Sequence, residues 1–200
     1  MDGTLWDAVS TYTKAWNEYF RIEGKGHSID PEIFRSLMGV EEKLFLPIIL
    51  PYMEENELSV IYKEMVIPLI YKAVEQDGGQ LYDGVLEGLK RLSMKYRLFI
   101  VSNCPEKLIE YFIRWAGISD LITDSLAHGQ NFRPKSDNIL QIKEKYGLVH
   151  PVYVGDTDSD RLQSEKANVP FIFMEYGFGK CDRYKMKFSK FDEFVEYILY

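Results

Sequence analysis

Apolar residues recur at helical spacing through the first part of the chain, from about residue 8 to residue 78. Glycine and proline punctuate this stretch, as in Asp30-Pro31 and Asp77-Gly78-Gly79, and divide it into several segments. One predicted helix carries an aromatic face made of Tyr12, Trp16, Tyr19 and Phe20. No strand pattern interrupts these segments. We therefore predict that residues 8–80 form an all-α unit.

Beyond Gly84 the pattern changes to short apolar runs that alternate with helical segments. The runs show no alternation of polar and apolar residues, which is typical of parallel strands covered on both faces. The sequence therefore predicts an α/β fold, with a Rossmann-like parallel sheet flanked by helices and an inserted helical unit. We expect residues 1–7 and 81–200 to form the α/β core. The predicted strands lie at 98–101, 121–123, 152–154 and 171–174.

Charge and composition narrow the classes of partner. The chain has 24 Lys and Arg against 31 Asp and Glu, a formal net charge of −7, whereas nucleic-acid and anionic-membrane binding favour a basic face. No apolar run is long enough to cross a bilayer, the N-terminus has no signal-peptide pattern, and two cysteines cannot build a disulfide framework. We expect a cytoplasmic protein, a monomer or weak homodimer, with a small-molecule partner and no nucleic acid or membrane.

The densest group of carboxylates follows one of the predicted strands. In parallel α/β sheets, ligands bind beyond the carboxyl ends of the strands. Asp156 stands at such an end, and Asp160 comes four residues later as a helix begins. One or two carboxylates completed by water and substrate oxygen suit Mg²⁺. The alternative is that Asp158 or Ser159 only caps the helix while the other carboxylates face solvent.

Three further polar residues lie at comparable places. Lys135 precedes a predicted helix whose N-terminus favours an anion. Ser102 and Asn103 end a predicted strand and offer a hydroxyl and an amide that suit phosphate oxygens. Each has a simpler interpretation, since loop lysines are usually solvated and such polar pairs often just end strands.

The order of these motifs resembles the haloacid-dehalogenase-like hydrolase superfamily. The order is Asp2-Gly3-Thr4, the strand that ends in Ser102, then Lys135, then Gly155-Asp156 with Asp160. The segment 135–179 is similar to the phosphoglycolate-phosphatase-like branch, in which a helical cap follows the first motif. The resemblance implies a Mg²⁺-dependent phosphatase that hydrolyses a small phosphorylated metabolite through an aspartyl-phosphate. It also implies that residues 8–80 are the cap.

The resemblance assigns a role to each motif residue. Asp2 matches the second aspartate of the family's DxDGT motif, so it would be the general acid and base, and its backbone carbonyl would contact the metal. Ser102 would bond the transferring phosphoryl group, and Lys135 would neutralise charge around it. The other implied contacts are substrate binding by Thr4 and Asn103, beside Ser102 and Lys135, and Mg²⁺ binding by Asp156 and Asp160.

The nucleophile of that motif falls one position before Met1, together with the strand that leads to it. One interpretation is that the natural chain starts earlier, since loss of a central strand would cost more than a typical stability of about 5–15 kcal/mol. The other is that the chain acts without this nucleophile. As written, the chain is expected to be inactive. The alternatives to a phosphatase are a β-phosphoglucomutase-like phosphomutase and a non-catalytic homologue that binds a phosphate ligand.

Overall fold

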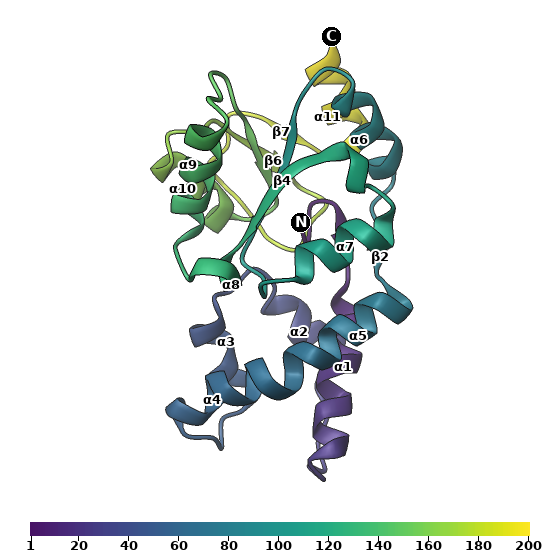
Figure 1. The fold of residues 1–200 in the computed structure, drawn as a ribbon, viewed down its shortest axis with the longest axis vertical. Helices are drawn as coiled ribbons and strands as arrows, with labels where there is room; N and C mark the ends of the chain where they lie inside the picture. Colours follow the sequence, from purple (N-terminus) through teal and green to yellow (C-terminus); the bar gives the residue numbers. More distant parts are fainter. The chain divides into compact units, whose positions relative to one another are not determined.

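The computed structural model describes residues 1–200, which divide into two compact units (Figure 1). We call Met1–Asp7 together with Leu81–Tyr200 the α/β unit, and Ala8–Gln80 the helical unit. No helix in either unit combines the length and the apolar character needed to cross a bilayer.

The helical unit is built around its first helix. Trp16 and Phe20, both fully buried, lie on one face of that helix, and the Trp16 ring stacks on Tyr62 with centroids 5.8 Å apart. A second helix begins where Asp30 accepts a hydrogen bond from the Glu32 N–H at 2.8 Å, so the Asp30-Pro31 pair starts a helix. The elements in order are α1 (Val9–Ile22), α2 (Pro31–Ser36), α3 (Glu42–Ile49), α4 (Glu55–Ile61), the π-helical η1 (Tyr62–Val66) and α5 (Ile67–Asp77).

The α/β unit alternates strands with helices, and this confirms the predicted fold class. Two short strands, β1 (Trp6–Asp7) and β2 (Gln80–Leu81), pair where the chain passes between the units. The elements that follow are α6 (Val85–Ser93), β3 (Leu98–Ser102), α7 (Leu108–Ala116), the 3₁₀ turn η2 (Ser119–Leu121), β4 (Ile122–Ala127), α8 (His128–Asn131), α9 (Lys135–Lys145), β5 (Tyr153–Gly155), α10 (Asp158–Lys166), β6 (Phe171–Met174), β7 (Lys187–Phe188) and α11 (Phe191–Leu199).

All strand pairs from β3 onward are parallel, but they form two sheets. β3 pairs with β4, and β5, β6 and β7 form a second sheet in that order. β3 and β5 therefore each have a strand on one edge only. Both strands line a cavity of about 720 Å³ whose walls include Phe99, Val101 and Val154. The hydroxyl of Tyr153 donates to the Val101 carbonyl oxygen at 3.1 Å and so links the two sheets.

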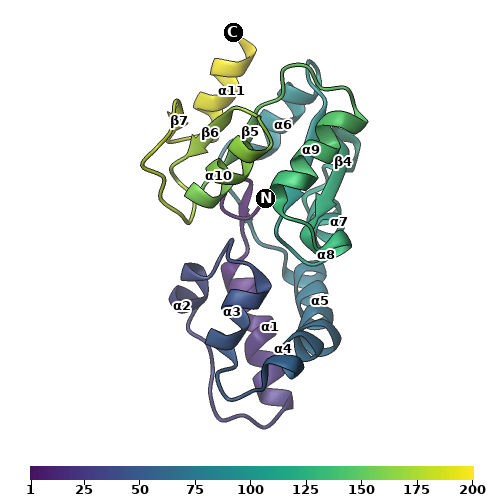
Figure 2. The ribbon, with the colours of Figure 1, turned by 90° about the vertical axis from the view of Figure 1, so that its left-hand side faces the viewer.

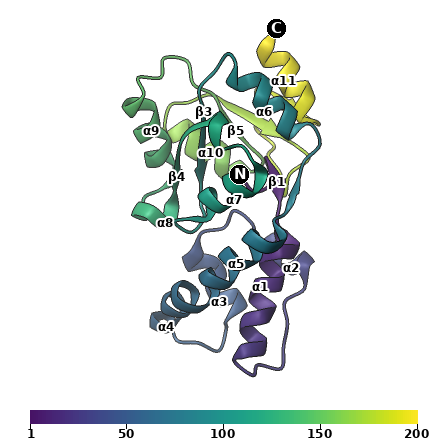
Figure 3. The same cartoon turned by 45° about the vertical axis from the view of Figure 1, so that its right-hand side comes forward.

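Helices cover the strands and bury an apolar core. α9 packs against β3. α10 packs against α9, β5 and β6 (Figure 2). α6 and α11 pack against each other elsewhere in this unit (Figure 3). One core cluster joins β3, α9 and the end of α10 through Val101, Ile139, Ile142, Ala167 and Val169. This packing fixes the carboxyl ends of β3 and β5, where the candidate residues lie.

Candidate functional site

Asp156 is the point at which three distant segments of the α/β unit meet. It follows β5 and is only 3% exposed. The Thr4 hydroxyl donates to its Oδ1 at 3.0 Å, and the Phe178 backbone N–H donates to its Oδ2 at 2.9 Å. Both carboxylate oxygens are therefore held by neutral donors.

Glycines make this close approach possible. Gly3 has a φ of +73°, and a Cβ at this position would lie 2.0 Å from the Asp156 Oδ2. A Cβ at Gly177 would lie 2.2 Å from the Asp156 Cβ and 2.4 Å from the Gly3 carbonyl oxygen. Because no side chain fits at either position, the turn after Asp2 and the loop after β6 both close directly onto Asp156.

Lys135 and Asp160 form a buried ion pair beside this point. The Lys135 Nζ lies 2.6 Å from the Asp160 Oδ1, and the two side chains are 10% and 7% exposed. The other carboxylate oxygen of Asp160 accepts hydrogen bonds from the Thr157 hydroxyl at 2.8 Å and the Thr157 N–H at 3.2 Å. The lysine is therefore an ordered part of the site, not a solvated loop residue.

The start of α10 corrects one sequence interpretation. Thr157 is the N-cap, because its hydroxyl accepts the Asp160 N–H at 3.0 Å while the Asp160 side chain bonds the Thr157 N–H in return. Neither Asp158 nor Ser159, the two capping residues considered from the sequence, has this role. Thr157 has an extended backbone and a hydroxyl oxygen within reach of the Asp160 N–H, so it meets the geometry of the cap, and the Asp158 side chain bonds Arg161 instead.

The two buried aspartates have opposite pKa shifts. Burial raises the pKa of Asp156 to about 6, and the nearby Asp160 charge adds to that rise. Burial also acts to raise the pKa of Asp160, but the Lys135 charge and the hydrogen bonds from Lys135 and Thr157 together outweigh it and hold this pKa below its ordinary value. Burial acts to lower the pKa of Lys135, but the charge and hydrogen bond of Asp160, together with Tyr153 and Asp156, outweigh it and raise this pKa. The site thus holds a charged pair next to a carboxylate that protonates easily.

The end of β3 contributes a second group of residues near a buried thiol. Ser102 is buried at the last position of the strand, and the half-buried Asn103 follows it. Burial raises the pKa of the Cys104 thiol to about 12, the Asp2 charge adds to the rise, and a Ser102 hydrogen bond and the Lys135 charge oppose it. Asp2, Ser102 and Lys135 therefore all influence the same buried thiol.

Several contributors to the site were given no role from the sequence, although the loop after β6 lies within the segment 135–179 that carries the family resemblance. Phe178 acts through its backbone N–H, so no side-chain motif could reveal it. Tyr176 donates its hydroxyl to the Thr4 carbonyl oxygen at 2.7 Å and holds the N-terminal turn from the same loop. Cys104 directly follows the Ser102-Asn103 pair, and its buried thiol was not predicted from the sequence. The glycines at 177 and 179 in the sequence were the available signal for this loop, because closely spaced glycines often mark a close backbone approach.

The chemistry of these donors fits one class of metal ion. The structure contains no group of three or more His, Cys, Asp or Glu side chains arranged to hold a metal. Mg²⁺ takes one or two carboxylates and fills its remaining positions with water and substrate oxygen. Asp156 suits this ion, because a cation beside it would offset the cost of ionising a buried carboxyl. Asp160 already bonds Lys135 and Thr157, so it fits better as a support.

Comparison with known proteins gives consistent results. A family model described as haloacid dehalogenase-like hydrolase matches residues 1–174. The chain is 24% identical to a phosphoglycolate phosphatase from Rhodobacter capsulatus, over 90% of this chain and 84% of the relative. It is 26% identical to a phosphoglycolate phosphatase from Psychrobacter arcticus, over 99% of this chain and 93% of the relative.

Solved structures share the fold. A crystal structure from Haemophilus somnus 129PT, described as a predicted phosphoglycolate phosphatase, has a TM-score of 0.83 and 18% identity and covers 99% of this chain and 95% of its own. A predicted phosphatase from Clostridium acetobutylicum has a TM-score of 0.80 and 19% identity, with 100% and 95% covered. At these identities the structural similarity establishes the fold.

Proposed function

Because this chain belongs to the haloacid dehalogenase-like hydrolase family, we propose that it is a Mg²⁺-dependent phosphatase that hydrolyses a small phosphoric monoester. The observation that carries the proposal is the buried Lys135–Asp160 pair beside Asp156 at the carboxyl ends of the strands. A fixed cation and a carboxylate suited to Mg²⁺ are what phosphoryl transfer requires, since that reaction depends mainly on alignment and on neutralising oxygen charge. The two phosphoglycolate phosphatases among the relatives support a small phosphorylated acid as the substrate.

Each residue of the site has a proposed part in binding. Lys135 neutralises charge on the phosphoryl group, and Asp160 fixes its position. Ser102 donates its hydroxyl to a phosphoryl oxygen, with Asn103 beside it. Asp156 and the Asp2 carbonyl hold Mg²⁺, and Asp160 supports the ion through water. Thr4 orients Asp156 through its hydroxyl and also contributes to substrate binding. Mg²⁺ supplies further neutralisation of phosphoryl oxygens when bound.

Asp2 is the proposed proton donor and acceptor. As a carboxylic acid it protonates the oxygen of the leaving alcohol, and as a carboxylate it takes the proton from the attacking water. Its charge acts on the same thiol as Ser102 and Lys135, which supports its place in the site. The aspartyl-phosphate route implied by the family resemblance also requires a nucleophilic carboxylate at the position directly before Met1. We further propose that the helical unit is the cap that determines specificity, and that the protein is cytoplasmic.

The test measures release of inorganic phosphate from 2-phosphoglycolate and a panel of sugar phosphates, with and without Mg²⁺. It is run on the 200-residue chain and on the same chain carrying one strand-forming segment that ends in aspartate before Met1. We expect Mg²⁺-dependent release from the extended chain and little or none from the chain as it stands. Binding of phosphate esters by the extended chain without any turnover would contradict the enzymatic function and favour a non-catalytic binding protein.

A further inference from the structure

The loop between β6 and β7 lies against the segment that leads into α10 and contacts Asp156, Thr157 and Asp158 in turn. The Phe178 N–H bonds the Asp156 carboxylate, and the Asp158 N–H donates to the Lys180 carbonyl oxygen at 3.2 Å. At Gly179 a Cβ would lie 2.7 Å from the Thr157 Cγ2. We call residues 176–183 the clamp loop, because its backbone lies directly against the segment that carries Asp156.

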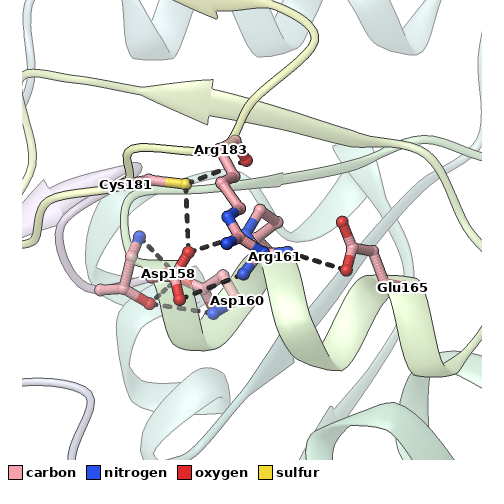
Figure 4. A network of polar contacts seen from close by, with 7 residues as sticks. Asp158, Asp160, Arg161, Glu165, Cys181 and Arg183 are labelled. Atoms are coloured by element: carbon pink, nitrogen blue, oxygen red, sulfur yellow. Dashed lines mark hydrogen bonds and ion pairs between the residues drawn. The ribbon is translucent and has the colours of Figure 1, made fainter.

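A network of side chains fastens the clamp loop to α10 (Figure 4). Arg161 grips Asp158 with two hydrogen bonds, from Nε to Oδ1 at 2.7 Å and from Nη2 to Oδ2 at 3.2 Å. Its third nitrogen, Nη1, bonds Glu165 at 2.8 Å. The thiol of Cys181 lies 3.6 Å from the same Asp158 Oδ1 and 3.4 Å from the Arg183 carbonyl oxygen. Asp158 therefore joins the helix to the loop.

Arg161 is unusual in its surroundings. It is a buried cation, 7% exposed, and sits one residue after Asp160 without bonding to Asp160 or Asp156 in the network. Two carboxylates, Asp158 and Glu165, share the charge of Arg161, and their side chains are 45% and 59% exposed. None of the residues in this network is among those proposed to bind Mg²⁺ or the phosphoryl group.

We propose that Arg161 is a positioning residue for the metal site: it holds Asp158 and thereby the clamp loop, which keeps the Phe178 N–H on Asp156. This inference rests on the proposed function in taking Asp156 as the Mg²⁺ carboxylate. Arg161 touches neither substrate nor metal in this arrangement. Its effect reaches Asp156 through Asp158, the Lys180 carbonyl and the loop backbone.

The experiment compares Arg161→Met with Arg21→Met in the full chain. Arg21 is a matched control, because it also grips a carboxylate three residues earlier with two bonds, to Glu18 at 2.7 Å each, but it is exposed and lies in the helical unit. Amide hydrogen exchange of the clamp loop is measured by mass spectrometry without metal. Binding of Mg²⁺ alone is measured from the rise in melting temperature with increasing Mg²⁺.

In Arg161→Met we expect amide exchange in the clamp loop to speed up at least about tenfold and Mg²⁺ affinity to fall about fivefold. Arg21→Met should change both by less than about twofold. If Arg161→Met fails to fold, Arg161→Lys retains the charge but loses the two-bond grip, so it should give the same changes in smaller measure.

The outcomes separate this inference from the proposed function. Unchanged loop exchange in both Arg161 variants overturns the inference, as does faster exchange with wild-type Mg²⁺ affinity. If the wild-type protein binds no Mg²⁺, the proposed metal at Asp156 is contradicted, and the role of Arg161 in Mg²⁺ binding fails as well. Faster loop exchange in the Arg161 variants would then still show that Arg161 holds the loop. Faster exchange together with weaker Mg²⁺ binding supports both.

Discussion

At the scale of single residues, the site depends on how charge is balanced where water is excluded. Lys135 and Asp160 are each costly to bury alone, and they are stable only as a pair. Asp156 accepts hydrogen bonds from two neutral donors, and its raised pKa of about 6 lets it lose or gain a proton close to neutral pH. The sequence indicated these three residues through their motif order. It could not indicate the Phe178 N–H, since a backbone donor is the same in every residue except proline.

Removal of the lysine should show the strength of this pairing. Lys135→Met leaves the Asp160 carboxylate buried without its cation, and we expect a loss of about 3–5 kcal/mol in the free energy of unfolding. The loss should shrink toward pH 4, because protonation of Asp160 removes the uncompensated charge. Urea denaturation at pH 7 and pH 4 measures both values. Lys14→Met, which removes the exposed pair with Asp77, should cost less than about 1 kcal/mol.

Acidity should control metal binding at Asp156. A proton and Mg²⁺ compete for this carboxylate, whose pKa is raised to about 6, so Mg²⁺ affinity should fall about tenfold for each pH unit below 6.

The raised pKa of Asp156 affects folding stability in the opposite direction. In the metal-free protein, protonation of Asp156 favours the folded state as the pH falls through about 6, whereas the depressed pKa of Asp160 makes its contribution decline at lower pH.

Mg²⁺ titrations between pH 5 and pH 8, followed by melting temperature, test the competition. The Asp156→Asn variant is the control, since its amide does not titrate and should show weak Mg²⁺ binding at every pH. A wild-type affinity that is the same at pH 5 and pH 7 would contradict the assignment of Asp156.

At the scale of elements, short apolar runs in the sequence identified strands, but the predicted ends of those strands were wrong where polar residues belong to them. The run at 121–123 predicted a strand, yet Leu121 belongs to the 3₁₀ turn η2, and β4 extends through polar residues to Ala127. Asp124 is accommodated in that strand because Lys145 and Tyr146 bond its carboxylate at 2.7 and 2.9 Å. These partners come from another element, so local sequence could not reveal them.

The cap of α10 is testable at this same scale. Thr157→Ala removes the hydroxyl that accepts the Asp160 N–H and donates to its carboxylate, and we expect a loss of about 1 kcal/mol in the free energy of unfolding. Thr157→Ser keeps the hydroxyl and should stay within about 0.5 kcal/mol of wild type. Equal losses in the two variants, measured by chemical denaturation, would assign the effect to the lost methyl group instead of the cap.

At the scale of the whole molecule, the chain forms two units with separate cores, and one of them contains every residue assigned to metal and phosphate binding. In the sequence, the change from helical periodicity to short apolar runs indicated an all-α segment followed by an α/β segment. The division of the strands into two sheets was not evident there, because pairing between strands depends on long-range register that no local pattern encodes.

This segregation predicts where Mg²⁺ acts. Amide hydrogen exchange with and without Mg²⁺ should show protection in the clamp loop and at the start of α10, and no change between Val9 and Asp77. Comparable protection in the helical unit would place part of the ion's coordination outside the residues proposed here.

The free edges of β3 and β5 also have a consequence for behaviour in concentrated solution. A strand edge without a partner offers a row of backbone donors and acceptors that can serve as a template for another chain. The apolar walls between these edges would reward such pairing. Lys95 and Arg97, just before β3, are charges of the kind that discourage edge-to-edge aggregation.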